Sequence, residues 1–140
     1  MATIVIAGWA RAQVVPLNPL VVTPDELKWT PNPAGFEVSR VAGDPSKQGT
    51  YVNRVKFPGG LKLQPHFHPD ERVGTVLSGT FYVGYGERFD ESKMRPLPAG
   101  SLWTEPAKQP HFVWAKDGEV IIQVVGVGPS GTTQVIDGAK

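Results

Sequence analysis

Short apolar runs, separated by clusters of turn residues roughly every 8 to 12 positions, cover most of the chain. Val, Ile, Thr and aromatic residues fill these runs, and such residues favour β-strands. We expect strands over residues 36–41, 50–57, 61–68, 73–85, 102–104, 111–115 and 119–127. Asp117-Gly118, between the last two runs, favours a hairpin turn. Many short strands and no helical periodicity of useful length predict an all-β domain, either a sandwich or a barrel.

The two ends of the chain follow different patterns. Residues 14–22 are apolar but broken by prolines, which favours an edge strand or an arm over a central strand. Thr23-Pro24-Asp25-Glu26 has the capping-box spacing with proline at the first helical position, so we expect one short helical turn there. The tail after Gly128 is expected to form a last edge strand or an arm that contacts a partner subunit. Residues 1–140 are interpreted as a single domain.

Composition narrows the function classes. The 140 residues include 16 glycines and 14 prolines, which suits a chain with many tight turns. A formal net charge of +1, without a basic run, gives no sign of binding to nucleic acid or to an anionic membrane. No stretch approaches the ~18 apolar residues of a membrane-spanning helix. Cysteine is absent, which excludes disulfides, thiolate metal sites and cysteine nucleophiles.

The N-terminus leaves the location of the protein open. Residues 4–9 are apolar, and Ala10-Arg11-Ala12 before Gln13 resembles a small-x-small cleavage site. Residues 1–22 are therefore either an arm that carries the remnant of an export signal or an ordinary leading arm. A periplasmic or secreted location and a cytoplasmic one are equally compatible with this segment.

The three histidines are the strongest candidates for chemistry. His66 and His68 stand one residue apart in an expected strand, where side chains at i and i+2 share a face. Two imidazoles on one face can form half of a metal site, and His111, after a second turn cluster, can supply a third ligand. The alternative is that His66 and His68 are ordinary strand histidines bonded to the backbone.

Three amide side chains are candidates for the lining of a substrate pocket. Strand alternation places Gln64 on the face of His66 and His68. Asn53 lies in an otherwise apolar row of its run, and Gln123 has a similar position in the last run. Because a buried amide requires hydrogen-bond partners, each is a candidate contact for a small molecule.

Two motifs around the histidines resemble the paired metal-site motifs of the cupin superfamily. The first cupin motif runs Gly, five residues, His-x-His, three or four residues, Glu, six residues, Gly. The second runs Gly, five residues, Pro-x-Gly, two residues, His, three residues, Asn. The matching positions are Gly60, His66, His68 and Gly79 in the first and Gly100, Pro106 and His111 in the second. The resemblance covers about residues 50–127 and implies a jelly-roll β-barrel or sandwich, here with an N-terminal arm and at most one or two short helical turns.

Three positions depart from the cupin pattern. Arg72 stands where the first motif has its glutamate, with Glu71 one residue earlier, and a guanidinium cannot ligate a cation. Either Glu71 turns inward to complete a site with the histidines, or, as we favour, the histidines act alone while Arg72 pairs with Glu71 and binds a substrate carboxylate. Lys108 replaces the second motif's glycine, which implies a rearranged turn or about 1 kcal/mol of strain at positive φ. Ala115 replaces its asparagine.

The resemblance implies one divalent transition metal per chain, and imidazole ligands suit Fe, Mn, Ni, Zn or Cu. The three-histidine iron sites of the thiol dioxygenase branch imply oxygen activation on a small organic substrate, with Arg72 and Glu71 as catalytic candidates. The alternatives are a non-catalytic ligand-binding or sensor protein, and an isomerase or lyase that uses the metal as a Lewis acid. Edge strands and apolar outer faces predict a homodimer.

Overall fold

The computed structural model describes residues 13–136, so the candidate export signal at residues 1–12 lies outside the described residues. The described chain contains eleven strands and two single turns of 3-10 helix. The turns are η1 (Pro24–Glu26) and η2 (Glu91–Lys93). The strands are β1 (Thr30–Pro31), β2 (Glu37–Ala42), β3 (Gly49–Phe57), β4 (Lys62–Phe67), β5 (Arg72–Ser78), β6 (Thr80–Tyr85), β7 (Arg95–Pro98), β8 (Leu102–Glu105), β9 (His111–Trp114), β10 (Val120–Gly128) and β11 (Thr133–Gln134). The all-β prediction is confirmed.

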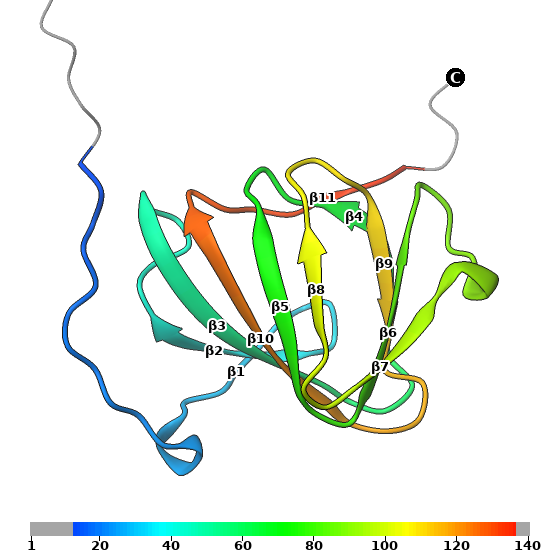
Figure 1. The fold of residues 1–140 in the computed structure, drawn as a ribbon, viewed down its shortest axis with the longest axis horizontal. Helices are drawn as coiled ribbons and strands as arrows, with labels where there is room; N and C mark the ends of the chain where they lie inside the picture. The colour runs from blue at the N-terminus through cyan, green and yellow to red at the C-terminus, as the bar shows by residue number, and fades with distance from the viewer. Residues whose placement is uncertain (1–12, 137–140) are drawn as a thin grey trace, which may run out of the picture.

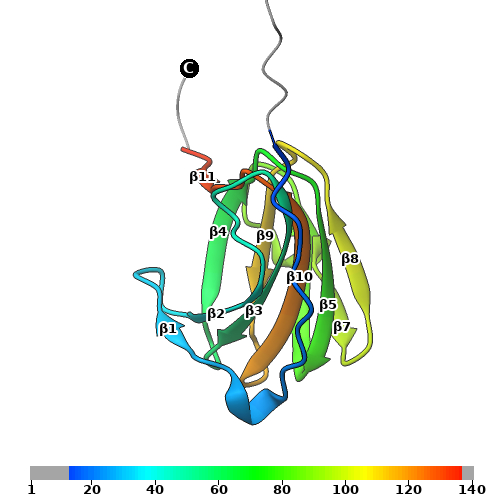
Figure 2. The same cartoon turned by 90° about the vertical axis from the view of Figure 1, so that its left-hand side faces the viewer.

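The strands form two antiparallel sheets that pack face to face (Figures 1 and 2). One sheet has the order β1-β2-β3-β10-β5-β8 and the other the order β11-β4-β9-β6-β7. The run over residues 73–85 divides at Gly79, where the chain passes from β5 in the first sheet to β6 in the second. Gly79 has φ +79°, and a Cβ there would lie 2.4 Å from the carbonyl oxygen of Glu119, so only glycine fits this corner.

The turn at Asp117-Gly118 is not a hairpin, and that prediction was wrong. β9 pairs with β4 and β6, whereas β10 pairs with β3 and β5, so the turn joins two different sheets. Gly118 does adopt a positive φ of 140°, which explains the glycine. A turn dipeptide sets only the local direction of the backbone. Whether the two flanking strands pair in one sheet or face each other across the core depends on how their side chains pack in that core.

The predictions for the two ends of the described chain are confirmed, but one edge strand in the middle of the sequence was not predicted. The Thr23 N–H donates to Glu26 Oε2 over 2.7 Å in η1, and β11 pairs with β4 as a last edge strand. Residues 13–22 form an extended arm along the outside of the sandwich (Figure 2). β7, which contains two prolines, was not predicted; it forms the edge of its sheet, where a missing N–H is tolerated.

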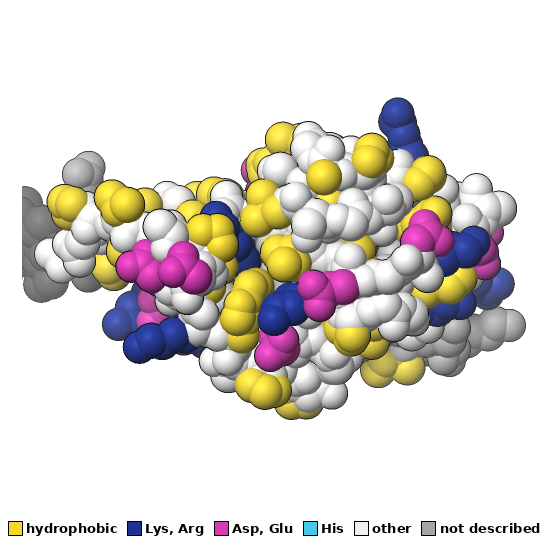
Figure 3. Space-filling view, turned by 90° about the horizontal axis from the view of Figure 1, so that it is seen from below, with side chains coloured by type: hydrophobic (Ala, Val, Ile, Leu, Met, Phe, Trp, Pro, Cys, Tyr) yellow, Lys and Arg dark blue, Asp and Glu magenta, His cyan; other side chains and the backbone are white. Residues whose placement is uncertain are grey.

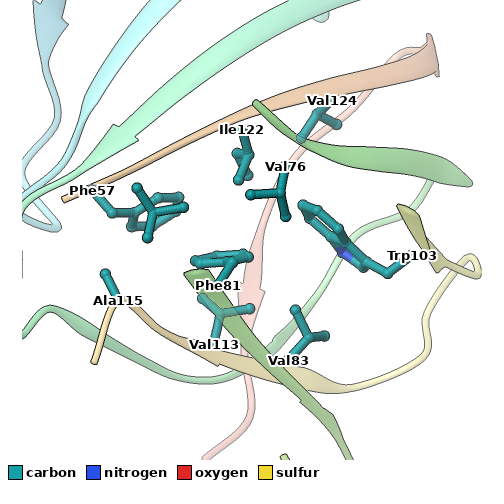
Figure 4. Close-up of a cluster of buried hydrophobic side chains, with 10 residues drawn as sticks. Phe57, Val76, Phe81, Val83, Trp103, Val113, Ala115, Ile122 and Val124 are labelled. Carbon is teal, nitrogen blue, oxygen red and sulfur yellow. The ribbon is translucent and has the colours of Figure 1, made fainter. Parts of the chain in front are cut away.

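The hydrophobic core lies between the inner faces of the two sheets. Figure 4 shows its side chains pointing from both sheets into one shared space. The ring centroid of Phe81 lies 5.0 Å from that of Phe57 and 5.4 Å from that of Trp103. The buried members are Phe57, Val76, Phe81, Val83, Trp103, Val113, Ala115, Val120, Ile122 and Val124. Several of them also line the cavity that leads to the histidines.

The outer surface mixes apolar and charged side chains. Figure 3 looks at the lower end of the sandwich, where the two kinds are interspersed and no histidine is visible. On the outer face of β5, β8 and β10, exposed apolar side chains gather: Val73, Leu102, Val125 and Val127. The homodimer stays a prediction, which size-exclusion chromatography with light scattering checks. Within residues 13–136, no helix is long and apolar enough to cross a membrane.

Candidate metal centre

The fold brings the three histidines together. His66 lies near the end of β4 and His68 directly after it, while His111 begins β9. β4 and β9 are paired, with His66 opposite His111. All three side chains are buried, and one ring nitrogen of each lies within 4.8 Å of the others. This separation allows all three nitrogens to bind one metal ion.

Hydrogen bonds to backbone carbonyls fix the tautomer of each ring. The Nδ1 atoms of His66, His68 and His111 lie 2.7, 2.7 and 3.2 Å from the carbonyl oxygens of Gln64, Gly131 and Gln109. A carbonyl oxygen only accepts, so each Nδ1 carries the proton and each Nε2 keeps a free lone pair. Bonds of this kind commonly orient metal-binding histidines.

The surroundings also keep the rings neutral. Burial lowers the pKa of His66 and of His111. Burial, together with the nearby Arg72 cation, lowers the pKa of His68 to about 3. Neutral imidazole is the form that binds a metal.

A fourth group, Glu105 at the end of β8, faces this cluster. Its carboxylate is buried, and its Oε1 accepts a hydrogen bond from the Trp103 Nε1 over 3.0 Å. Oε1 lies 3.5 Å from Nε2 of His111, and Oε2 lies 3.5 Å from Nε2 of His68. Oε2 has no hydrogen-bond partner among the described residues. Burial raises the pKa of Glu105, and the nearby Arg72 cation and the Trp103 hydrogen bond offset only part of this effect.

Arg72, at the start of β5, is held between two carboxylates. Its guanidinium lies 3.6 Å from Asp70 Oδ2 and 3.8 Å from Glu105 Oε2, and its Nη2 donates to Ser130 Oγ over 2.5 Å. Asp70 is itself buried and accepts hydrogen bonds from Ser130 and from Tyr51. Burial and the bond to Asp70 raise the pKa of Tyr51 to about 12. Arg72 is therefore already neutralised within the protein.

Glu71 takes neither of the positions considered from the sequence. It is exposed, and no ion pair joins it to Arg72 within residues 13–136. Glu71 comes directly before β5, whose first residue Arg72 points inward, while Asp70 is buried in the bend that precedes it; Glu71 therefore points outward between them. The carboxylates that face Arg72 are Asp70 and Glu105 instead.

A cavity of about 380 Å³ opens onto the histidines. Asn53 lines it as expected, on the inward face of β3, and its buried Oδ1 has no hydrogen-bond partner within residues 13–136. Most of the wall is apolar, formed by Phe36, Val38, Val55, Phe57, Leu63, Phe81, Val113, Ile122 and Val124.

Gln64 and Gln123 do not line this cavity, and their placement on its wall was wrong. A bulge in β4 pairs Leu63 with Val113 and His66 with His111, which leaves one extra residue in β4 and turns the exposed Gln64 outward. Gln123 lies on the outer face of β10 and accepts a hydrogen bond from Arg54 Nε over 3.1 Å. Both faces of β10 are rich in valine and isoleucine, so the sequence pattern could not decide which face was inward.

Sequence comparison matches residues 17–130 to the ChrR Cupin-like domain. The chain belongs to this cupin family. Germin-like protein subfamily T member 2 of Arabidopsis thaliana is 32% identical over 89 residues, and this cupin spans 40% of that relative's length.

Solved structures share the fold of this cupin. The polyketide cyclase RemF from Streptomyces resistomycificus has a TM-score of 0.70 at 16% identity, covering 87% of this chain and 89% of that one. KdgF from Halomonas sp. has a TM-score of 0.61 at 24% identity, covering 75% and 91%. An oxalate oxidase in complex with the substrate analogue glycolate has a TM-score of 0.61 at 25% identity, covering 83% and 63%.

The donor set of this cupin fits a divalent transition metal. Three neutral imidazoles present free Nε2 atoms toward one point, and each ring is fixed by a carbonyl behind it. Glu105 was missed in the sequence, although a signal exists. It stands two residues after Trp103 in a short strand and directly before Pro106 of the second motif, so it shares the inward face with that buried indole.

Proposed function

We propose that this cupin is a metal-dependent enzyme that acts on a small organic molecule with dioxygen as co-substrate. The observation that carries the proposal is the convergence of three free Nε2 atoms at the wall of a cavity of about 380 Å³. When bound, a redox-active divalent metal supplies positions for dioxygen and for a polar group of the substrate. Similarity to an oxalate oxidase at 25% identity supports oxygen chemistry in particular.

The chain's own residues hold and shield the site. The carbonyls of Gln64, Gln109 and Gly131 fix the histidine rings, so little reorganisation accompanies binding. Apolar side chains such as Phe81, Val113 and Val124 line the cavity beside the histidines.

The cavity wall favours a largely apolar substrate with one polar group. Pockets of a few hundred Å³ hold small organic ligands. Asn53 Oδ1 has no hydrogen-bond partner in the described part of the chain, so we propose that it accepts a hydrogen bond from an O–H or N–H of the substrate. A carboxylate on the substrate is not required, because Arg72 already faces Asp70 and Glu105.

The test starts from protein purified without a histidine tag, freed of metal and reloaded with Fe(II). Oxygen consumption is then measured with a panel of small aromatic and aliphatic alcohols, phenols and ketones. We expect consumption that depends on both metal and substrate and is lost in His111→Ala. Asn53→Ala should raise KM roughly tenfold with kcat less affected, if one hydrogen bond of about 1.4 kcal/mol is lost.

Three results would overturn the proposal. Failure to take up stoichiometric metal would remove the centre itself. Turnover at the same rate without oxygen would assign the metal a Lewis-acid role, as in an isomerase or lyase. Ligands that bind to the metal-loaded protein without any turnover would indicate a binding or sensor protein.

A further inference from the structure

We propose that Glu105 provides the carboxylate ligand of the metal centre, and that Arg72 occupies the place from which cupins normally supply it. This inference rests on the metal centre of the proposed function. Glu105 lies in β8, within the second motif, whereas the cupin pattern places its glutamate in the first motif, at the position of Arg72.

The contacts of Glu105 are those of a ligand without its ion. Its two oxygens lie 3.5 Å from the Nε2 atoms of His68 and His111. Those nitrogens carry no proton, because their rings donate through Nδ1. Carboxylate oxygen and bare nitrogen both offer lone pairs, so they repel each other unless a cation or a proton lies between them. The 3.5 Å separation is longer than a hydrogen bond from a protonated carboxyl group, which leaves room for a cation.

The separation also suits a shared ion. Two ligand atoms that each lie about 2.1 Å from one metal are about 3.0 Å apart at 90° and about 3.4 Å apart at the tetrahedral angle. The observed 3.5 Å between Glu105 Oε2 and His68 Nε2 is close to the upper value. Oε1 accepts a hydrogen bond from Trp103 at 3.0 Å, while the buried Oε2 has no hydrogen-bond partner among residues 13–136. The free oxygen is the one available to a metal.

Strand register explains how a carboxylate on β8 can substitute for one on β5. Arg72 and Glu105 are directly opposite each other in the β5–β8 pair, and both side chains point inward. Residues opposite each other have Cβ atoms about 4.5–5.5 Å apart. A glutamate at position 105 therefore reaches the region that a glutamate at position 72 would reach.

Arg72 does not satisfy Glu105 by itself. The distance of 3.8 Å between Nη1 and Oε2 exceeds the roughly 2.7–2.9 Å of a charge-assisted hydrogen bond. Arg72 instead bonds to Ser130 and faces Asp70. The two buried carboxylates and one guanidinium leave a negative charge beside three neutral imidazoles, which favours a divalent cation. Arg72 is thus a positioning residue.

The test measures Co²⁺ binding to the metal-free protein by competition with a chromophoric chelator and by the visible absorption of the complex. Glu105→Gln keeps the size of the side chain and an acceptor for Trp103 but removes the charge. We expect affinity to fall at least 10- to 100-fold, since changes to groups that only support the ligands already cost that much. The absorption bands should shift, because the ligand field changes. Glu71→Gln, which removes an exposed charge one residue from Arg72, should leave both readouts unchanged.

A second variant restores the usual cupin arrangement. Arg72→Glu combined with Glu105→Arg should recover most of the Co²⁺ affinity that Glu105→Gln loses. If Glu105→Gln does not fold, this double variant tests the assignment of Glu105 as a ligand in its place. Equal affinity and spectrum in wild type and Glu105→Gln, or a folded exchange variant no better than His111→Ala, would overturn the ligand assignment. A wild-type protein that binds no Co²⁺ would instead overturn the proposed function, so the two failures are distinguishable.

Discussion

Replacing Gly74 by alanine should destabilise the protein by about 1–3 kcal/mol, because the added methyl group has no room. Gly74 lies on the inward face of β5, and a Cβ there would lie 2.3 to 2.5 Å from three atoms of the Trp103 indole. Carbon atoms in contact are normally about 3.5–4.0 Å apart, so the ring would have to retreat by about 1 Å. Phe81, whose ring centroid is 5.4 Å away, lies in the same packed core and limits that retreat. Gly74 does not have a positive φ, so the clash alone carries the cost.

The free energy of unfolding is measured by urea titration followed by circular dichroism. Gly131→Ala is the matched control, because no atom of the other described residues lies within 4 Å of its added Cβ, and it should be neutral or stabilising by up to about 1 kcal/mol. Trp103→Phe removes part of the clashing ring, so in that background Gly74→Ala should cost less, and the double mutant should be less destabilised than the sum of the two single mutants. If Gly74→Ala and Gly131→Ala unfold at the same urea concentration, the packing argument is refuted.

The surroundings of the metal centre give three more predictions. Lys108→Gly should raise the free energy of unfolding by up to about 1 kcal/mol, because Lys108 holds a φ of 62°; a lower urea midpoint would contradict this. Ser130→Ala should cost about 1–3 kcal/mol, since it removes the hydroxyl that accepts from Arg72 Nη2 and donates to Asp70 Oδ1 in a partly buried network, and a melting temperature equal to wild type would count against that network. The lowered pKa of His68 means that between pH 6.5 and about 3 the unfolded chain binds a proton that the folded chain does not. Metal-free protein should therefore lose stability as pH falls through this window, and a melting temperature constant from pH 7 to pH 4 would be inconsistent with a buried neutral ring.

Much of the fold and half of the metal centre could be predicted from local patterns. Period-2 runs between turn clusters identified most strands, because a strand that buries one face must alternate. The spacing of His66, His68 and His111 within two motifs indicated that the three would meet, and they do. At Lys108 the cupin pattern left a rearranged turn and a positive φ as alternatives, and the structure has a φ of 62°.

The missed features depend on partners distant in the sequence. Asp117-Gly118 marks a turn, yet only the packing of the core separates β9 and β10 into different sheets. The bulge that turns Gln64 outward arises from the pairing of β4 with β9. The residues of β4 alone do not specify this register, so the sequence pattern could not reveal the bulge.

The sequence by itself determined an all-β cupin with three converging histidines, because strand alternation and motif spacing are local properties of the chain. It also showed that the usual glutamate is replaced by Arg72. Only the tertiary structure decided where the carboxylate comes from: β8 lies beside β5 with Glu105 opposite Arg72, so a residue 33 positions later fills the gap. Strand pairing brings such residues together through hydrogen bonds between backbones. Every strand can form these bonds whatever its side chains, so the side chains of one strand do not show which strand lies beside it.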